Sequence, residues 1–212
     1  MTLPLFGPPA PRRIELPDGD VTYISGFMEP AECRVYFEQL QGAIAWRHEE
    51  VSLYGRRIPL PRLTAWHGDP EASYTYSRIQ NKPCPWTSPL LAIKQRVEAR
   101  TGATFNGVLL NLYRDGEDSI AWHSDDEREF GERPTIASLS LGAHRVFWMR
   151  HKHDKEVPKV SQELEDGSLL VMQGDTQRFW EHEIRKSKAV RGARINLTFR
   201  LVKPAVVSNP HR

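Results

Sequence analysis

Three residues of the types that bind redox-active metals occur in the second half of the sequence. His123 and Asp125 are two positions apart, and alternate side chains of an extended chain leave the same face, so both can reach one ion. His182 follows much later, at the centre of a predicted strand, where it can converge on that ion. Two imidazoles and one carboxylate leave three octahedral positions open, as in non-haem Fe(II) oxygenases, whereas a structural zinc site closes its coordination sphere. The alternative at this point is three ordinary strand and surface residues.

The last hydrophobic segment alternates polar and apolar side chains with a period of two. One face carries Arg194, Asn196, Thr198 and Arg200, and the other carries Ile195, Leu197, Phe199 and Leu201. Guanidinium groups match carboxylates in a bidentate fashion, so the polar face can hold a dicarboxylate. The two arginine Cα atoms would lie about 20 Å apart, so both side chains must lean inward. An amphipathic edge strand with solvated arginines is the alternative.

A second polar wall is offered by the segment 108–114. Asn111 and Tyr113 lie on one face of this predicted strand, and their amide and phenol groups can hydrogen-bond carboxylate oxygens. Taken alone, both residues are equally compatible with a structural role.

The helices and strands that must position these residues are predicted from the positions of proline and glycine and from local composition. Helices are predicted over 29–42 and 89–102, each with a proline in its first turn and a glycine at its end. Short β-rich runs separated by turn signals predict strands at 105–114, 135–141, 144–150, 168–173, 178–184 and 194–202. The fold class is therefore mostly β with flanking helices, a double-stranded β-helix or jelly roll.

The chain divides into four stretches. Prolines predict a loosely ordered arm over 1–20, followed by a substrate-recognition region over 21–104, the jelly-roll catalytic core over 105–203 and a tail over 204–212. The net charge of +2 does not by itself indicate nucleic acid. Basic residues nevertheless outnumber acids eight to two between Arg178 and Lys203, and the run 150–153 adds to them. Such clusters can neutralise phosphates, although a solvated basic face fits equally well.

The expected cellular location is inferred from the few cysteines and from the lack of leader and membrane-spanning patterns. The two cysteines, Cys33 and Cys84, have no metal-knuckle or disulfide spacing, and neither a leader segment nor a membrane-spanning run is evident. We expect a monomer in the cytoplasm, or in the nucleus of a eukaryote, without a membrane partner.

Taken together, these motifs resemble the AlkB family of Fe(II)- and 2-oxoglutarate-dependent nucleic-acid dealkylases, and most of all its duplex-DNA-repairing branch. The similarity runs from about Leu53 to Val202. Its most specific segments, in this order, are 111–116, 123–127 and 194–200.

The resemblance implies a role for each matching residue. Fe(II) would be held by His123, Asp125 and His182, which are also the catalytic residues. The co-substrate 2-oxoglutarate would be held by Asn111, Tyr113, Arg194, Thr198 and Arg200. The substrate would be contacted by Tyr54, Gly55, Arg56, Tyr74, Thr75, Tyr76, Asp126 and Glu127, with Tyr76 stacking on the damaged base.

One departure from the family concerns duplex recognition. The segment 53–56 is similar to a hairpin that fills the gap left by a flipped base, but the aromatic residue here is Tyr54 rather than phenylalanine. The match is short, and any basic surface loop would look the same.

The implied activity uses dioxygen and 2-oxoglutarate to remove alkyl groups from bases such as 1-methyladenine and 3-methylcytosine in DNA, releasing formaldehyde. A non-catalytic module that binds damaged nucleic acid is the first alternative. An oxygenase acting on RNA, protein or a small metabolite is the second.

Overall fold

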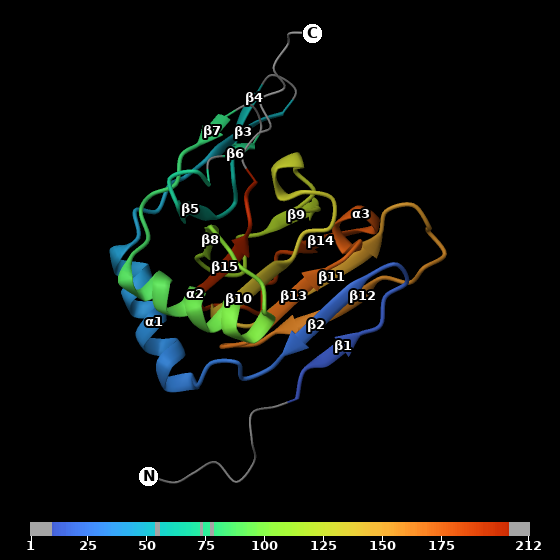
Figure 1. Ribbon diagram of the computed structural model, residues 1–212, viewed down its shortest axis with the longest axis horizontal. Coiled ribbons are helices and arrows are strands. Elements are labelled where there is room, and N and C mark those ends of the chain that lie inside the picture. Colours follow the sequence, from blue (N-terminus) through green and yellow to red (C-terminus); the bar gives the residue numbers. More distant parts are fainter. Residues whose placement is uncertain (1–9, 54–55, 73, 77–78, 204–212) are drawn as a thin grey trace.

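Two antiparallel sheets face each other in the computed structural model, which describes residues 10–53, 56–72, 74–76 and 79–203 (Figure 1). The large sheet has the strand order β1-β2-β13-β10-β15-β8-β5. Its strands are β1 (Arg12–Ile14), β2 (Asp20–Ile24), β13 (Leu169–Gln173), β10 (Ile136–Gly142), β15 (Arg194–Arg200), β8 (Gly107–Tyr113) and β5 (Leu63–Gly68). The small sheet has the order β12-β11-β14-β9 and consists of β12 (Val160–Leu164), β11 (Arg145–His151), β14 (Trp180–Ile184) and β9 (Ile120–His123). This mostly β sandwich with flanking helices confirms the predicted jelly-roll class.

Two hairpins and four helical segments complete the described part of the chain. The hairpins pair β3 (Glu50–Leu53) with β4 (Arg56–Pro59), and β6 (Tyr74–Tyr76) with β7 (Ile79–Asn81). Both lie at the end of the sandwich where β9 lies, at the top of Figure 1. The helical segments are α1 (Pro30–Ala43), α2 (Ser88–Thr101), the 3-10 turn η1 (Arg128–Phe130) and α3 (Thr176–Phe179). None of the helices in the described residues has the length and apolarity needed to cross a membrane.

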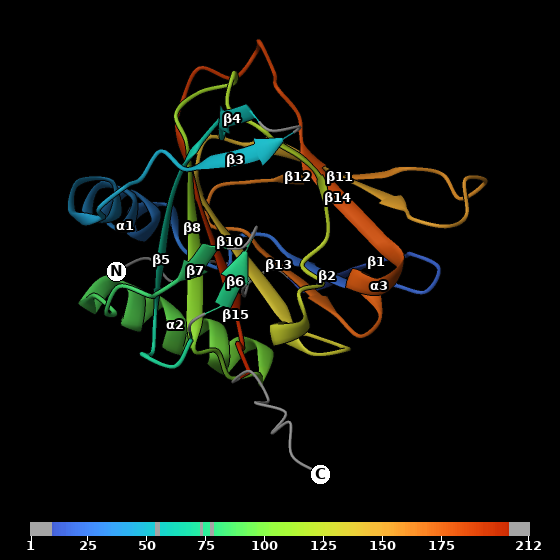
Figure 2. The same cartoon turned by 90° about the horizontal axis from the view of Figure 1, so that it is seen from above.

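Helices α1 and α2 cover the face of the large sheet that is turned away from the small sheet (Figure 2). Proline occupies the first turn of each helix, where the missing N–H leaves no helical bond unmade. Gly102 ends α2 at φ +68°, a backbone conformation that favours glycine.

The alternation of polar and apolar residues along β15 is explained by the helices on one side of the strand and the small sheet on the other. Its apolar residues Ile195, Leu197 and Phe199 are fully buried against the helices. Its polar residues point the other way, into the space between the sheets. A second apolar cluster fills that inter-sheet space and includes Phe147, Met149 and Trp180.

Three predicted boundaries were wrong. Residues 176–179 form helix α3, so the strand predicted over 178–184 begins only at Trp180. The final strand ends at Arg200, and Leu201 is 41% exposed rather than part of the apolar face. Helix α1 runs past Gly42 and ends with Ile44 in an extended conformation as its C-cap.

The predicted N-terminal arm is only partly an arm. Arg12–Ile14 forms the edge strand β1. Ile14 at its end and Leu16 just after it are both buried. The main sheet also takes β1, β2 and β5 from before residue 105, so it extends across the boundary drawn between the recognition region and the core.

Candidate active site

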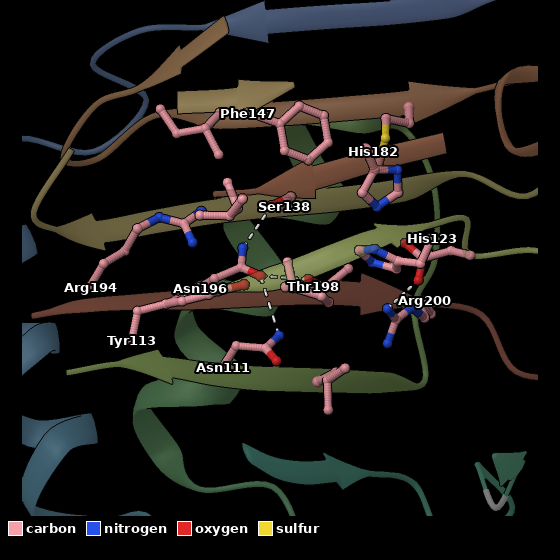
Figure 3. Close-up of a pocket in the computed structure, with 16 residues that line it drawn as sticks. Asn111, Tyr113, His123, Ser138, Phe147, His182, Arg194, Asn196, Thr198 and Arg200 are labelled. Carbon is pink, nitrogen blue, oxygen red and sulfur yellow. Dashed lines mark hydrogen bonds and ion pairs between the residues drawn. The ribbon is translucent and has the colours of Figure 1, made fainter. Parts of the chain in front are cut away.

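A narrow cavity of about 40 Å³ lies between the two sheets (Figure 3). All eight residues expected to hold iron or 2-oxoglutarate line it, namely Asn111, Tyr113, His123, Asp125, His182, Arg194, Thr198 and Arg200. They come from β8, β9, β14, β15 and the loop that follows β9. Figure 3 shows the two histidines and Arg200 at one end of the cavity, and Tyr113 and Arg194 at the other.

The histidine end is built by strand pairing. His123 and His182 face each other across β9 and β14, and their ring centroids are 4.2 Å apart. The ring of Phe147 stacks on His182 at 4.9 Å and supports it from the apolar side. The pairing of two distant strands therefore brings both imidazoles to one point.

Both imidazoles are held in the neutral form that binds metals. Burial lowers the pKa of His182 to about 3, and burial also lowers the pKa of His123. The Nδ1 atom of His123 lies 2.9 Å from the Ala121 carbonyl oxygen, which can only accept, so Nδ1 carries the proton. The lone pair of Nε2 is then available to a metal ion.

Asp125 supplies a charged carboxylate beside the two rings. Burial is the largest single effect and opposes ionisation, but attraction to Arg200, together with smaller contributions from His182 and His123, holds the pKa of the Asp125 carboxyl below its usual range. Arg200 Nη2 donates to Asp125 Oδ1 at 2.5 Å, and both side chains are nearly inaccessible to solvent. The backbone N–H of Asp125 donates to Gln177 Oε1 at 2.9 Å, which fixes the loop to α3.

Among the described residues, no group of three His, Cys, Asp or Glu side chains is arranged as a ready metal site, and the Asp125 carboxylate faces Arg200. The donor set nevertheless fits Fe(II), since neutral imidazoles and an ionised carboxylate are the ligands of a two-histidine, one-carboxylate site.

A hydrogen-bonded network occupies the middle of the cavity wall. Asn196 Nδ2 donates to Ser138 Oγ at 2.7 Å, and Thr198 Oγ1 donates to Asn196 Oδ1 at 2.9 Å. Asn111 Nδ2 lies 3.5 Å from the same Asn196 oxygen. Because these polar groups satisfy one another, the wall is rigid between the two charged ends.

The far end contains a buried cation with unused donors. Arg194 is 2% exposed, and its Nη2 donates to Ser140 Oγ at 2.9 Å. Its Nε and Nη1 atoms are buried without a hydrogen-bond partner. Leaving such donors unmade is costly, and a guanidinium forms charge-assisted hydrogen bonds to carboxylate oxygens. This end of the cavity therefore fits the distal carboxylate of 2-oxoglutarate.

The sequence did not single out several residues that shape this site. Arg62 is buried and donates from Nε to Asn111 Oδ1 at 2.8 Å, and Ser138 and Gln177 hold Asn196 and Asp125. The segment containing Arg62 belonged to the family resemblance, which was the one available signal. Nothing in the local sequence distinguishes Ser138 or Gln177 from other polar residues.

The residues expected to contact the substrate are placed less completely. Asp126 is exposed, accepts a hydrogen bond from Lys152 at 2.9 Å and lines a groove of about 660 Å³. Glu127 is partly buried; burial raises its pKa to about 7, and its Oε2 has no hydrogen-bond partner.

The remaining expected contacts belong to the two hairpins. Tyr54 and Gly55 lie outside the described residues, between the paired strands β3 and β4. For Arg56 in β4 and for Tyr74, Thr75 and Tyr76 in β6, the structure describes the backbone alone.

The basic stretch 178–203 is not one surface patch. Arg194 and Arg200 are buried in the cavity, and Arg185 pairs with Glu183. In the run 150–153, His151 is buried and Arg150 pairs with Glu181. The structure therefore buries some of these charges in the interior and pairs others with carboxylates at the surface.

Comparison with known proteins is consistent with this geometry. Residues 11–200 match the model of the 2OG-Fe(II) oxygenase superfamily. The chain is 45% identical to alpha-ketoglutarate-dependent dioxygenase alkB homolog 3 of Bos taurus, over 84% of this chain and 65% of that protein. It is 38% identical to the human DNA oxidative demethylase ALKBH2, over 92% of this chain and 77% of that protein. The chain thus spans slightly less than two thirds of its alkB homolog 3 relatives, and the similarity covers both named groups.

A solved structure supports the fold. That of OsALKBH1 aligns with a TM-score of 0.62 over 90% of this chain and all of that chain, at 15% sequence identity. With a family match over nearly the whole described chain and these sequence identities, the protein belongs to the AlkB family within the 2OG-Fe(II) oxygenase superfamily.

Proposed function

We propose that this protein is an Fe(II)- and 2-oxoglutarate-dependent dioxygenase that removes alkyl groups from nucleic-acid bases, such as 1-methyladenine and 3-methylcytosine in DNA. The observation that carries the proposal is the cavity, with a neutral imidazole pair and a carboxylate at one end and buried, unused guanidinium donors at the other. The naming of a 38% identical relative as a DNA oxidative demethylase supports the choice of DNA. We further propose that it acts as a monomer in the cytoplasm, or in the nucleus of a eukaryote.

In this proposal His123, Asp125 and His182 hold the iron, and Asn111, Tyr113, Arg194, Thr198 and Arg200 hold 2-oxoglutarate. When bound, the iron and 2-oxoglutarate supply dioxygen activation: one oxygen atom enters succinate, with loss of carbon dioxide, and the other hydroxylates the N-alkyl carbon. The N-hydroxymethyl product then breaks its C–N bond, which yields formaldehyde and the restored base.

The chain's own residues position the reactants and limit access of water. Apolar side chains of Ile120, Phe147 and Met172 share the cavity wall with the polar ligands and narrow it. Water-poor surroundings strengthen the interactions of Arg194 and Arg200 with carboxylates. The cavity therefore favours a bound dicarboxylate over water.

A base inside a duplex cannot reach a cavity of this kind, so it must be flipped out, at a cost of a few kcal/mol. The hairpins β3–β4 and β6–β7 lie at the end of the sandwich near β9, which carries His123 (Figure 1). Asp126 lies on the adjoining groove. We propose that the groove and these hairpins receive the flipped base, with Tyr76 stacked on it and Tyr54, Gly55, Arg56, Tyr74, Thr75 and Glu127 contacting it or its neighbours.

Mass spectrometry of methylated oligonucleotides tests the proposed function. Incubation with the protein, Fe(II) and 2-oxoglutarate is expected to remove 14 Da per methyl group and to release formaldehyde. Tyr76→Ala and Asp126→Ala are expected to lose dealkylation while binding 2-oxoglutarate as before. Glu38→Ala, on the distant helix α1, is the control and should change neither property. Retention of full activity by both site variants, or no mass change with the unaltered protein, contradicts base dealkylation.

Tyr54→Ala is expected to slow repair of double-stranded substrate selectively. An inserted aromatic ring recovers part of the stacking lost on flipping, about 1–3 kcal/mol by analogy with base–aromatic contacts. Single strands contain no such gap, so their repair rate should be close to that of the unaltered protein. The measurement is the ratio of the two rates. An equal effect on both substrates, or no effect, removes the duplex-probing role and points to single strands or RNA.

A further inference from the structure

Arg145 is a buried cation that lies outside every role discussed so far. It begins β11, two residues before Phe147 on the same inward face, and is 2% exposed. Its Nη2 donates to the backbone carbonyls of Asp118 at 2.8 Å and of Arg185 at 2.7 Å, and its Nη1 to that of Asp115 at 3.1 Å. Its Nε is buried without a partner. Carbonyl oxygens hold this guanidinium in place but do not neutralise it.

Arg145 and Arg194 share one aromatic ring. Their guanidinium carbons lie 5.4 and 5.3 Å from the ring centroid of Tyr113, which lines the end of the cavity opposite the two histidines. Among the described residues, neither arginine forms an ion pair with a carboxylate; Arg194 is bonded to a serine hydroxyl. Burial, and to a smaller degree the repulsion from Arg145, lowers the pKa of Arg194 to about 10. Two like charges in a dry site are stabilised by the arrival of an anion.

We propose that Arg145 is a positioning and specificity residue for the co-substrate, whose charge beside Tyr113 makes the cavity end opposite the histidines select 2-oxo acids that carry a second carboxylate. The inference rests on the proposed function only in that 2-oxoglutarate binds in this cavity. In this arrangement Arg194 contacts the distal carboxylate directly. Arg145 acts at longer range, by holding the ring of Tyr113 and by adding positive potential that water does not screen.

A simpler role, anchoring the loop 114–118, can be tested separately because a second arginine holds the same loop. Arg114 binds both carboxylate oxygens of Asp118, from Nε at 2.8 Å and Nη2 at 2.7 Å, and so anchors residues 114–118 as Arg145 does. Arg114 is half exposed, and its charge is matched by Asp118. Weakening the loop through Arg114 therefore leaves the buried positive charge beside Tyr113 intact.

The test is anaerobic calorimetry of the iron-loaded protein, which measures binding without turnover. Each variant is titrated with 2-oxoglutarate and with 2-oxopentanoate, which has the same carbon chain but a methyl group in place of the distal carboxylate. The observable is the ratio of the two Kd values. Arg145→Gln keeps two N–H donors for the carbonyls but loses the charge, and is expected to weaken 2-oxoglutarate binding about tenfold, or about 1.4 kcal/mol, while 2-oxopentanoate binding is unchanged.

Two further variants separate charge from structure. Arg145→Lys keeps the charge and is expected to retain most of the ratio, and Arg114→Gln, the control, is expected to retain all of it. An unchanged ratio in Arg145→Gln, or an equal fall in Arg114→Gln, overturns the inference. If Arg145→Gln does not fold, Arg145→Lys decides. Equal Kd values for 2-oxoglutarate and 2-oxopentanoate in Arg145→Lys overturn the inference, and a retained difference between them supports it. Failure of the unaltered protein to bind 2-oxoglutarate overturns the proposed function as well.

Discussion

Alanine in place of His182 is expected to lower the rate of dealkylation by more than about 100-fold, because even the partners of metal ligands are worth 10–100-fold in affinity or activity. His182 and His123 provide the only imidazoles that line the cavity in the described part of the chain. Loss of one leaves two donors and a poorly held ion. The same result is expected for His123→Ala and Asp125→Ala. Activity and Fe(II) binding are measured on the same samples.

His144→Ala provides the matched control for this experiment. His144 is about half exposed and lies near Glu163 at the surface, so its removal should leave both activity and iron content unchanged. Thermal unfolding of each variant separates loss of the metal site from loss of the fold. This control is needed because removal of the buried His182 ring, which stacks on Phe147, also costs stability. A folded His182→Ala protein with full activity would remove His182 from the metal site.

The second large effect is expected for Arg200→Lys, which should raise the Kd for 2-oxoglutarate about tenfold or more, equivalent to at least about 1.4 kcal/mol. Arg200 Nη2 already binds Asp125 in a buried pair. A guanidinium can bind Asp125 and a second carboxylate through different nitrogens, whereas a lysine has one nitrogen on a flexible stem. Fe(II) affinity should fall in parallel, because Asp125 would lose a fixed partner.

Arg96→Lys is the control for an arginine-to-lysine change. Arg96 on α2 pairs with Glu32 on α1, on the outer side of the large sheet and away from the cavity. It should bind 2-oxoglutarate and Fe(II) as the unaltered protein does. An unchanged Kd for 2-oxoglutarate in Arg200→Lys would argue against any contact between this residue and the co-substrate.

Local patterns in the sequence were sufficient for the main strands after residue 105 and for the faces of the site. The period of two in 194–200 correctly assigned the apolar residues to the helix-covered face and the polar residues to the cavity, because successive side chains of a strand must alternate. The same rule placed Asn111 and Tyr113 on one wall. These predictions need no knowledge of what lies opposite the strand.

Local patterns failed where distant packing decides the conformation. The strand predicted over 178–184 begins two residues too early, because Asp20 N–H donates to Thr176 Oγ1 and Gln177 Oε1 accepts from Asp125, and these tertiary partners stabilise a helical turn over 176–179. The proline-rich N-terminus likewise yields the ordered strand β1, because β2 provides its hydrogen bonds.

The sequence by itself determined the fold class, the two faces of the final strand and which residue types could bind iron and a dicarboxylate. Only the tertiary structure decided that Arg200 is paired with Asp125, that Arg194 has buried donors to spare and that Arg145 stands beside Tyr113. The physical reason is that charge and hydrogen-bond satisfaction depend on partners brought together from separate strands. Alternation within one strand fixes only the direction in which a side chain points.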